Sequence, residues 1–180
     1  MKLALTYGSL MAFAGAVLTL LMFFAGLHDD TAKLKSAQWV GMVGGIAIGV
    51  ASLALAMKEK RRTYTTEEDW GYGNALGAGV LTGLVGALLG AVFAYLYFAI
   101  INPGLSDLMV QAQIDAMIEA GLPAAKAEET EPMMRKWMSP PAMTVFQAIF
   151  GFIWSVGLSL LIAIFYRQRP ELPNPASAAN

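Results

Sequence analysis

Four stretches of this chain carry no charged residue and no histidine over a length that would cross a lipid bilayer. They cover residues 3–27, 39–57, 75–101 and 141–166. A helix of about 20 apolar residues spans the hydrocarbon core, which is roughly 30 Å thick. Charged residues make up only 14% of the chain, against about 25% in a soluble domain, so they are too few to coat a soluble surface. The sequence therefore predicts four transmembrane helices.

These stretches define one domain over residues 1–169, which we expect to be an all-α, polytopic membrane protein with its four transmembrane helices in a bundle. A secretory signal peptide is the competing interpretation of the first stretch, but the apolar run is longer than such peptides need. The long connection at 103–139 is rich in helix-forming and apolar residues, which predicts a helical excursion lying across one end of the bundle. Residues 170–180 contain three prolines and small residues, which predicts a disordered tail.

The lysines and arginines favour one orientation in the membrane. Seven of them would share the side of the two termini, and the densest group lies at 58–62. Five would share the other side. Positively charged residues collect on the cytoplasmic side of membrane proteins. We therefore expect both termini in the cytoplasm and an extracytoplasmic excursion.

Small residues recur at four-residue spacing in three of the four stretches. Such rows let transmembrane helices approach closely, and lipid gives apolar side chains no other reason to associate. The residues expected to pack helices are Gly41, Gly45, Gly49, Gly79, Gly83, Gly86, Gly90, Gly151, Ser155 and Ser159. Packing within one chain is the first interpretation. The alternative is that one row forms a homodimer interface.

The residues needed for most membrane chemistry are missing from the sequence. The absence of charged residues from the four stretches argues against proton-coupled transport, aspartyl proteolysis and serine hydrolysis, which need a charged group or a base at depth. The absence of cysteine excludes thiolate zinc sites and iron–sulfur clusters. We therefore expect no catalytic residue, no cofactor, no metal ion and no enzymatic activity.

Two groups outside the stretches have weaker metal-binding interpretations. A cluster of thioethers has the softness that Cu(I) prefers, although methionine is also a flexible filler of apolar interfaces. This cluster comprises Met133, Met134, Met138 and Met143. His28 precedes Asp29 and Asp30 and is the chain's one histidine. We favour interface filling for the methionines and an exposed hairpin position for His28.

Several short motifs follow Trp70. They are Gly-Asn-Ala-Leu-Gly at 73–77, Phe93-Ala-Tyr95-Leu-Tyr97, Ile100-Ile-Asn-Pro103, and a helical segment with Met109, Gln113 and Met117. In these motifs the chain resembles an uncharacterised bacterial family of membrane proteins, domain-of-unknown-function family 4199. The resemblance implies a four-helix inner-membrane protein with an external helical excursion. It implies no activity, ligand or catalytic residue.

The first functional hypothesis is a non-enzymatic accessory or scaffold protein of the bacterial cytoplasmic (inner) membrane. It would contact the lipid bilayer and either form a homo-oligomer or join a membrane protein partner. The net charge of −1 supplies no basic field for nucleic acid. The alternative is a channel or carrier for small solutes, with an uncharged polar path. That path would be lined by Thr82, Gln147, Ser155 and Ser159.

Overall fold

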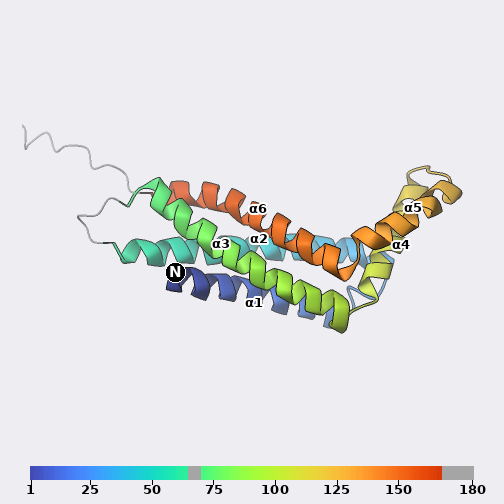
Figure 1. Ribbon diagram of the computed structural model, residues 1–180, viewed down its shortest axis with the longest axis horizontal. Helices are drawn as coiled ribbons and strands as arrows, with labels where there is room; N and C mark the ends of the chain where they lie inside the picture. Colours follow the sequence, from blue (N-terminus) through green and yellow to red (C-terminus); the bar gives the residue numbers. More distant parts are fainter. Residues whose placement is uncertain (65–69, 168–180) are drawn as a thin grey trace, which may run out of the picture.

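The computed structural model of the protein describes residues 1–64 and 70–167 and contains no strand in those ranges. Figure 1 shows its helical elements in chain order. They are α1 (Lys2–Phe24), α2 (Thr31–Arg62), α3 (Tyr72–Leu96), the π-helical turn η1 (Tyr97–Ile101), α4 (Leu105–Glu119), α5 (Ala124–Trp137) and α6 (Pro140–Tyr166). The predicted disordered tail at 170–180 lies outside the described residues.

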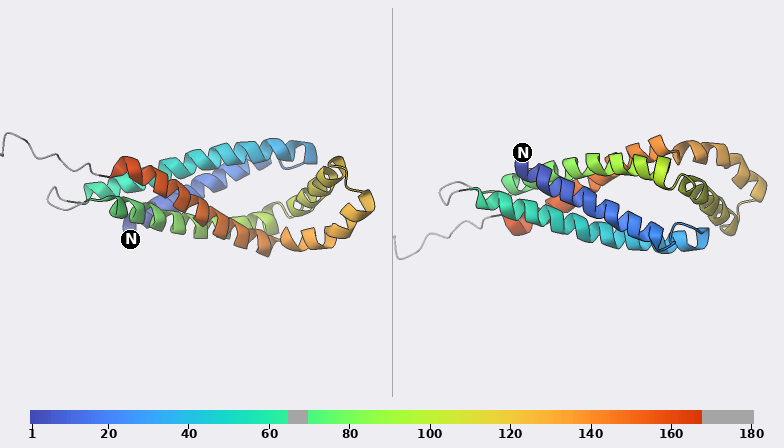
Figure 2. Two further views of the ribbon diagram at one scale, coloured as in Figure 1. Left: turned by 90° about the horizontal axis from the view of Figure 1, so that it is seen from above. Right: turned by 90° about the horizontal axis from the view of Figure 1, so that it is seen from below.

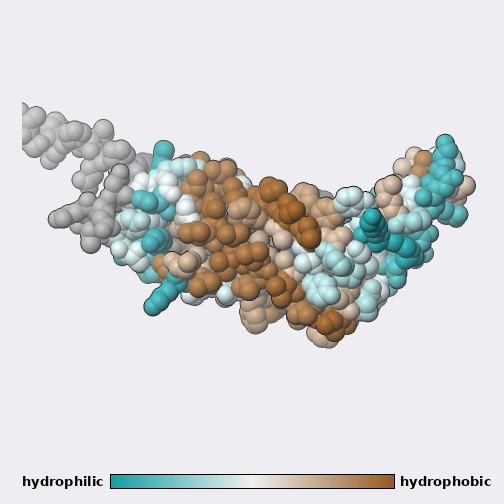
Figure 3. Space-filling model, viewed as in Figure 1, coloured by the Kyte–Doolittle hydropathy of each residue, from teal (hydrophilic) through white to brown (hydrophobic). Residues whose placement is uncertain are grey.

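Among the described residues, four helices are long and apolar enough to cross a membrane: α1, α2, α3 continued by η1, and α6. In Figure 3 apolar residues form a band along the middle of these helices, and hydrophilic residues gather at both ends. Large apolar side chains such as Phe13 of α1 and Leu161 of α6 are more than half exposed. A contiguous apolar surface of that kind is stable when it faces lipid. The chain is an all-α membrane protein, as its sequence predicts.

Helix α2 extends beyond the predicted stretch 39–57 at both ends. At its start, the carboxylate of Asp30 accepts a hydrogen bond from the Ala32 amide at 3.1 Å, which caps the helix. At its end, the basic residues at 58–62 continue the helix because they form helices well and their charge is favourable in the last turn. The connection between α1 and α2 therefore covers residues 25–30 and is shorter than the segment 28–38 between the first two predicted stretches.

The long helices diverge along their length. Figure 2 shows α1 with α2, and α3 with α6, close together at the end that holds the N-terminus and separated toward the other end. Helix α4 packs against α2 and α5 packs against α6, so these two short helices bridge the separated ends. We call this region the α4–α5 end. The molecule is thus closed at one end of the long helices and spread at the other.

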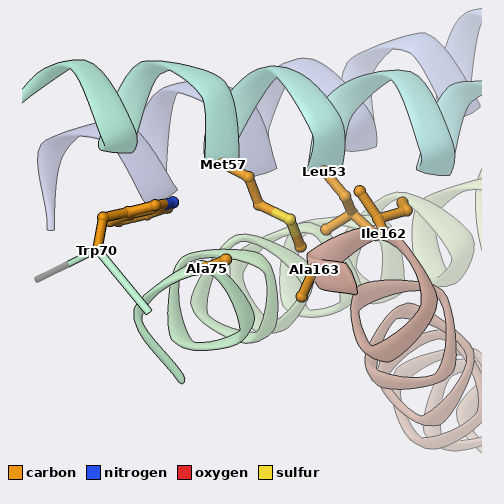
Figure 4. Packing of buried hydrophobic residues seen from close by; sticks show 6 residues of the cluster. All are labelled: Leu53, Met57, Trp70, Ala75, Ile162 and Ala163. Atoms are coloured by element: carbon orange, nitrogen blue, oxygen red, sulfur yellow. The ribbon is translucent and has the colours of Figure 1, made fainter. Parts of the chain in front are cut away.

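An apolar core around Trp70 closes the opposite end, as Figure 4 shows. Its buried members are Leu53, Met57, Trp70, Ala75, Ile162 and Ala163. Trp70 is 1% exposed, and its indole N–H donates to the Tyr166 carbonyl at 2.8 Å. The last carbonyls of a helix have no partner within it, so this bond satisfies one of them. It ties the segment before α3 to the end of α6.

The α4–α5 pair is anchored at the start of α4. Leu105 is buried against Leu34 and Tyr97, where α4 meets α2 and the end of α3. Arg135 of α5 forms an ion pair with Asp107 of α4. Figure 1 shows the pair extending past the ends of the long helices. The sequence predicts that this helical pair lies across the end of the bundle. Only the start of α4 packs against that end, and the remainder of α4 and α5 extends beyond it.

Candidate functional site

Three of the predicted packing glycines on α3, Gly79, Gly83 and Gly86, lie in close helix contacts. A β-carbon added at any of them would overlap a side chain of a neighbouring helix. The side chains in contact are Met57 and Ser159 at Gly79, Ser155 at Gly83, and Met11 at Gly86. Helix α3 therefore packs through its glycines against α1, α2 and α6.

Other predicted packing glycines lie beside open space. An ideal β-carbon at Gly45 or Gly90 would meet no side chain and no neighbouring helix within 4 Å. The packing role that the sequence predicts is therefore absent at these two positions, because the helices have already diverged there. The nearest neighbours of the remaining glycines are side-chain atoms at 3.1 to 3.9 Å. These glycines are Gly41, Gly49 and Gly151.

The open space is a cavity of about 620 Å³ between the diverging helices. Its volume falls within the range of about 300–1,000 Å³ that small-molecule sites occupy. Residues of α1, α2, α3, η1 and α6 line it, and Leu105 at the start of α4 lines it at the α4–α5 end. Along α2 its wall runs from Gln38 to Leu53, which at 1.5 Å per residue is about 22 Å.

The cavity is elongated along the helices. Its lining runs on α1 from Met11 to Met22 and on α3 from Gly86 to Ala94, so it follows both helices over several turns. An occupant that fills it would therefore lie parallel to the long helices.

Polar side chains gather where the cavity reaches the α4–α5 end. His28 Nδ1 lies 2.5 Å from the hydroxyl oxygen of Tyr97, and the side-chain amide of Asn102 donates to the same oxygen at 3.4 Å. Tyr97 begins the π-helical turn η1, which the bond from the Asn102 amide N–H to the Tyr97 carbonyl closes at 2.8 Å. Such turns are rare and occur often at functional sites. Here the turn holds Tyr97 and Asn102 beside His28.

The contact with Tyr97 occupies Nδ1 of His28 and leaves Nε2 free. The Tyr97 hydroxyl has one proton and two lone pairs, so it can donate to Nδ1 while it accepts from Asn102. We infer this arrangement, in which Nε2 carries the proton. Burial lowers the pKa of His28 from its ordinary 6.5, an effect larger than the opposing one of Asp29. His28 is thus neutral at pH 7 and keeps one N–H donor at Nε2.

Two glutamine amides line the same end of the cavity. Gln38 lies near the start of α2, and Gln147 lies about 10 Å along α6 from Pro140. Within residues 1–64 and 70–167, neither amide has a hydrogen-bond partner, and neither does His28 Nε2. Both glutamine side chains are exposed, and Gln38 directly precedes the charge-free stretch 39–57, at the end of the transmembrane segment. This end of the cavity therefore offers hydrogen-bonding groups to an occupant.

Aromatic rings surround the same polar end. The Tyr97 ring lies 6.0 Å from that of Phe93 and 5.8 Å from that of Phe98, between ring centroids. All three rings line the cavity, and none of the described residues that line it carries a full charge. The end thus combines neutral hydrogen-bonding groups with flat apolar surfaces.

The predicted solute path does not follow one cavity. Gln147 and Ser155 line the cavity described above, but the Ser155 hydroxyl donates to a carbonyl of its own helix at 2.8 Å. Ser159 lies in the contact with α3, and its hydroxyl has no partner in the part of the chain that the structure describes. Thr82 lines a separate cavity of about 340 Å³ at the opposite end.

The metal site considered at His28 is not assembled in the described structure. Among the described residues, no three His, Asp or Glu side chains come together in a metal-binding arrangement. His28 is half-buried against Tyr97, so the exposed hairpin position expected from the sequence is wrong. In the methionine cluster, Met133 is 65% exposed on α5.

Sequence reasoning missed Tyr97, Asn102 and Gln38 as site residues. The sequence feature that could have indicated Asn102 is Pro103, which has no N–H and therefore ends the helix at Asn102. A polar residue just before such a stop is well placed to bond back onto the last turn. Nothing in the sequence places His28 next to Tyr97, because that contact depends on how α1, α2 and α3 pack.

The comparisons with known proteins bear on most of this chain. A family model described as a protein of unknown function (DUF4199) matches residues 6–168. Neither a curated protein nor a solved structure matches the sequence.

Proposed function

The chain belongs to the DUF4199 family of proteins of unknown function, and we propose that it is a non-enzymatic membrane protein that binds an amphipathic molecule. The apolar tail of that molecule would occupy the cavity between α1, α2, α3 and α6. The observation that carries the proposal is the polarity of this cavity. Its length is lined by small and apolar residues, while His28, Gln38 and Gln147 lie at one end without enough partners.

The shape of the cavity supports a chain-like occupant. The cavity follows the long helices over about 22 Å, a length that suits an extended hydrocarbon tail better than a compact solute. The tail would run parallel to the long helices, as the surrounding lipid tails do. Gly45 and Gly90 then have a role, because a larger side chain at either position would narrow the space.

A binding role fits the chemistry of the site better than catalysis. The serine that lines the cavity, Ser155, donates its proton to the carbonyl of Phe152, and no base lies beside it in the described structure. A serine nucleophile needs such a base within hydrogen-bond reach. We therefore retain the accessory role expected from the sequence and propose a lipid-like molecule as the ligand.

The other roles expected from the sequence have less support. The closest glycine contacts, at Gly79, Gly83 and Gly86, are occupied within the chain, so those glycines are not free to pair with a second copy. The polar residues proposed for a solute path are distributed between two cavities and a helix contact. A homo-oligomer or a channel would need surfaces other than these.

We expect blocking the cavity to remove the ligand without unfolding the protein. In Gly45→Phe, the ring would enter the cavity, because nothing lies within 4 Å of the β-carbon position. Photocrosslinking with a long-chain alcohol that carries a diazirine in its tail measures occupancy, and mass spectrometry locates the crosslink. Labelling of the wall between Gly41 and Leu53 should fall at least about tenfold, or about 1.4 kcal/mol.

The matched control is Gly157→Phe on α6. Its β-carbon position is also open, but Gly157 does not line the cavity. Labelling in this variant should equal that of the unchanged protein. If Gly45→Phe is labelled on the same wall as strongly as Gly157→Phe, the cavity does not hold the tail and the proposed function is wrong.

We propose the orientation that the basic residues favour, with both termini in the cytoplasm. The chain has no cysteine, so labelling of a single introduced cysteine shows on which side of the membrane that position lies. Ala125 in α5 and Thr63 after α2 are both exposed. An impermeant maleimide should label Ala125→Cys in intact cells and Thr63→Cys only after the membrane is permeabilised. The reverse pattern would invert the orientation and leave the four helices in place.

A further inference from the structure

We propose that the α4–α5 end of the cavity is a headgroup site for an uncharged ring that accepts hydrogen bonds, such as the head of an isoprenoid quinone. This inference rests on the proposed function, because it assigns the head of the molecule whose tail fills the cavity. His28 is the central contact residue, and Tyr97 positions it. Only binding is assigned to the site.

The lack of charge in the lining selects a neutral head. None of the described residues that line the cavity is Lys or Arg. A phosphate or carboxylate head needs cationic or multiple backbone donors to compensate its lost hydration. Such a head would therefore bind poorly beside His28, which is neutral and lies near the negative charge of Asp29.

The available groups at this end are mainly donors suited to carbonyl oxygens. His28 Nδ1 is occupied by Tyr97, so the ring presents Nε2–H alone. Gln38 and Gln147 line the cavity from α2 and α6, and each amide carries an N–H₂ group without a partner in the described part of the chain. A quinone carries carbonyl oxygens on opposite sides of one ring. It can thus accept hydrogen bonds from different walls of the cavity.

The aromatic side chains favour a flat ring over a small hydroxyl head. Phe93, Tyr97 and Phe98 line the cavity around the polar groups, and their centroids are about 6 Å apart. Aromatic rings stack with another ring or pack edge-on against it, and both arrangements orient the ring. The π-helical turn fixes Tyr97 in this position, since its carbonyl and hydroxyl both bond to Asn102.

Three probes with the same decyl tail separate the contributions of tail, ring and charge. They are a decyl-substituted benzoquinone, decylbenzene and decanoate. Isothermal titration calorimetry with the full-length protein in detergent gives each Kd. The benzoquinone should bind most tightly, decylbenzene at least about threefold more weakly and decanoate most weakly, since each hydrogen bond contributes about 0.5–1.5 kcal/mol.

His28→Phe keeps a ring of similar size and removes the donor. It should weaken benzoquinone binding by about three- to tenfold and leave decylbenzene binding unchanged. Tyr97→Phe removes the hydroxyl that holds His28 Nδ1 and should weaken benzoquinone binding by a smaller factor. Because Tyr97→Phe is nearly isosteric, it provides a second test if His28→Phe does not fold.

The outcomes distinguish failure of this inference from failure of the proposed function. Equal binding of benzoquinone and decylbenzene, or tighter binding of decanoate, would overturn the headgroup site. Unchanged benzoquinone binding in both His28→Phe and Tyr97→Phe would also overturn it. In each case, if Gly45→Phe binds none of the three probes, the proposed binding of the tail in the cavity is still supported. If Gly45→Phe binds every probe normally, the proposed function itself fails.

Discussion

Gly83→Leu is expected to lower the free energy of unfolding by about 2–3 kcal/mol or more, because there is no space for its side chain. A β-carbon at Gly83 would lie 2.5 Å from the β-carbon of Ser155 on α6. Both residues are buried in the contact between α3 and α6. The two helices would have to separate, and their packing would be lost along several turns. Equilibrium unfolding in mixed micelles measures the change.

Gly77→Leu on the same helix is the matched control. Its β-carbon position has nothing within 4 Å, so the new side chain would extend away from the helix contacts. Replacing glycine in a helix also removes a penalty of up to about 1 kcal/mol. This variant should therefore be as stable as the unchanged protein or slightly more stable. Equal loss of stability in both variants would show that the α3–α6 contact is not as close as described.

Trp70→Ala is expected to cost about 3–5 kcal/mol, the range for deleting a large buried aromatic side chain. Trp70 fills the core that closes the end opposite α4 and α5 (Figure 4). Its removal would leave a cavity beside Met57 and release the carbonyl of Tyr166. The same unfolding measurement in mixed micelles applies.

Trp39→Ala provides the comparison for this second change. Trp39 is 60% exposed on α2 and belongs to no buried cluster of the described structure. Its replacement should alter the free energy of unfolding by less than about 1 kcal/mol. If Trp70→Ala is no more destabilising than Trp39→Ala, the closed end does not depend on this core, and the long helices are held together elsewhere.

The transmembrane helices were predictable because the signal is simple and local. A run without charge in lipid must be helical, and charged residues mark its limits. The limits of α2 were less accurate. The charge pattern placed the end of this helix at Lys58, where charged residues begin, but basic residues continue a helix readily. The start of the helix depends on the cap at Asp30.

The glycine rows illustrate the limit of pattern reading for the site. Gly83 and Gly45 have the same signal in the sequence, a small residue repeated every four positions. One lies in a close helix contact and the other beside a cavity. The difference arises because the helices diverge, and divergence is a property of the whole assembly of helices. The contact between His28 and Tyr97 depends on that same geometry.

The cavity should hold one apolar tail whose head lies beside His28. A crystal structure of the protein extracted with its native lipids and grown in a lipidic mesophase tests this most directly. We expect elongated electron density along α2 from Gln38 to Leu53, ending in a compact head near His28. A structure in which α2 closes onto α6 and leaves no cavity would contradict the account, as would one in which another helix occupies that space.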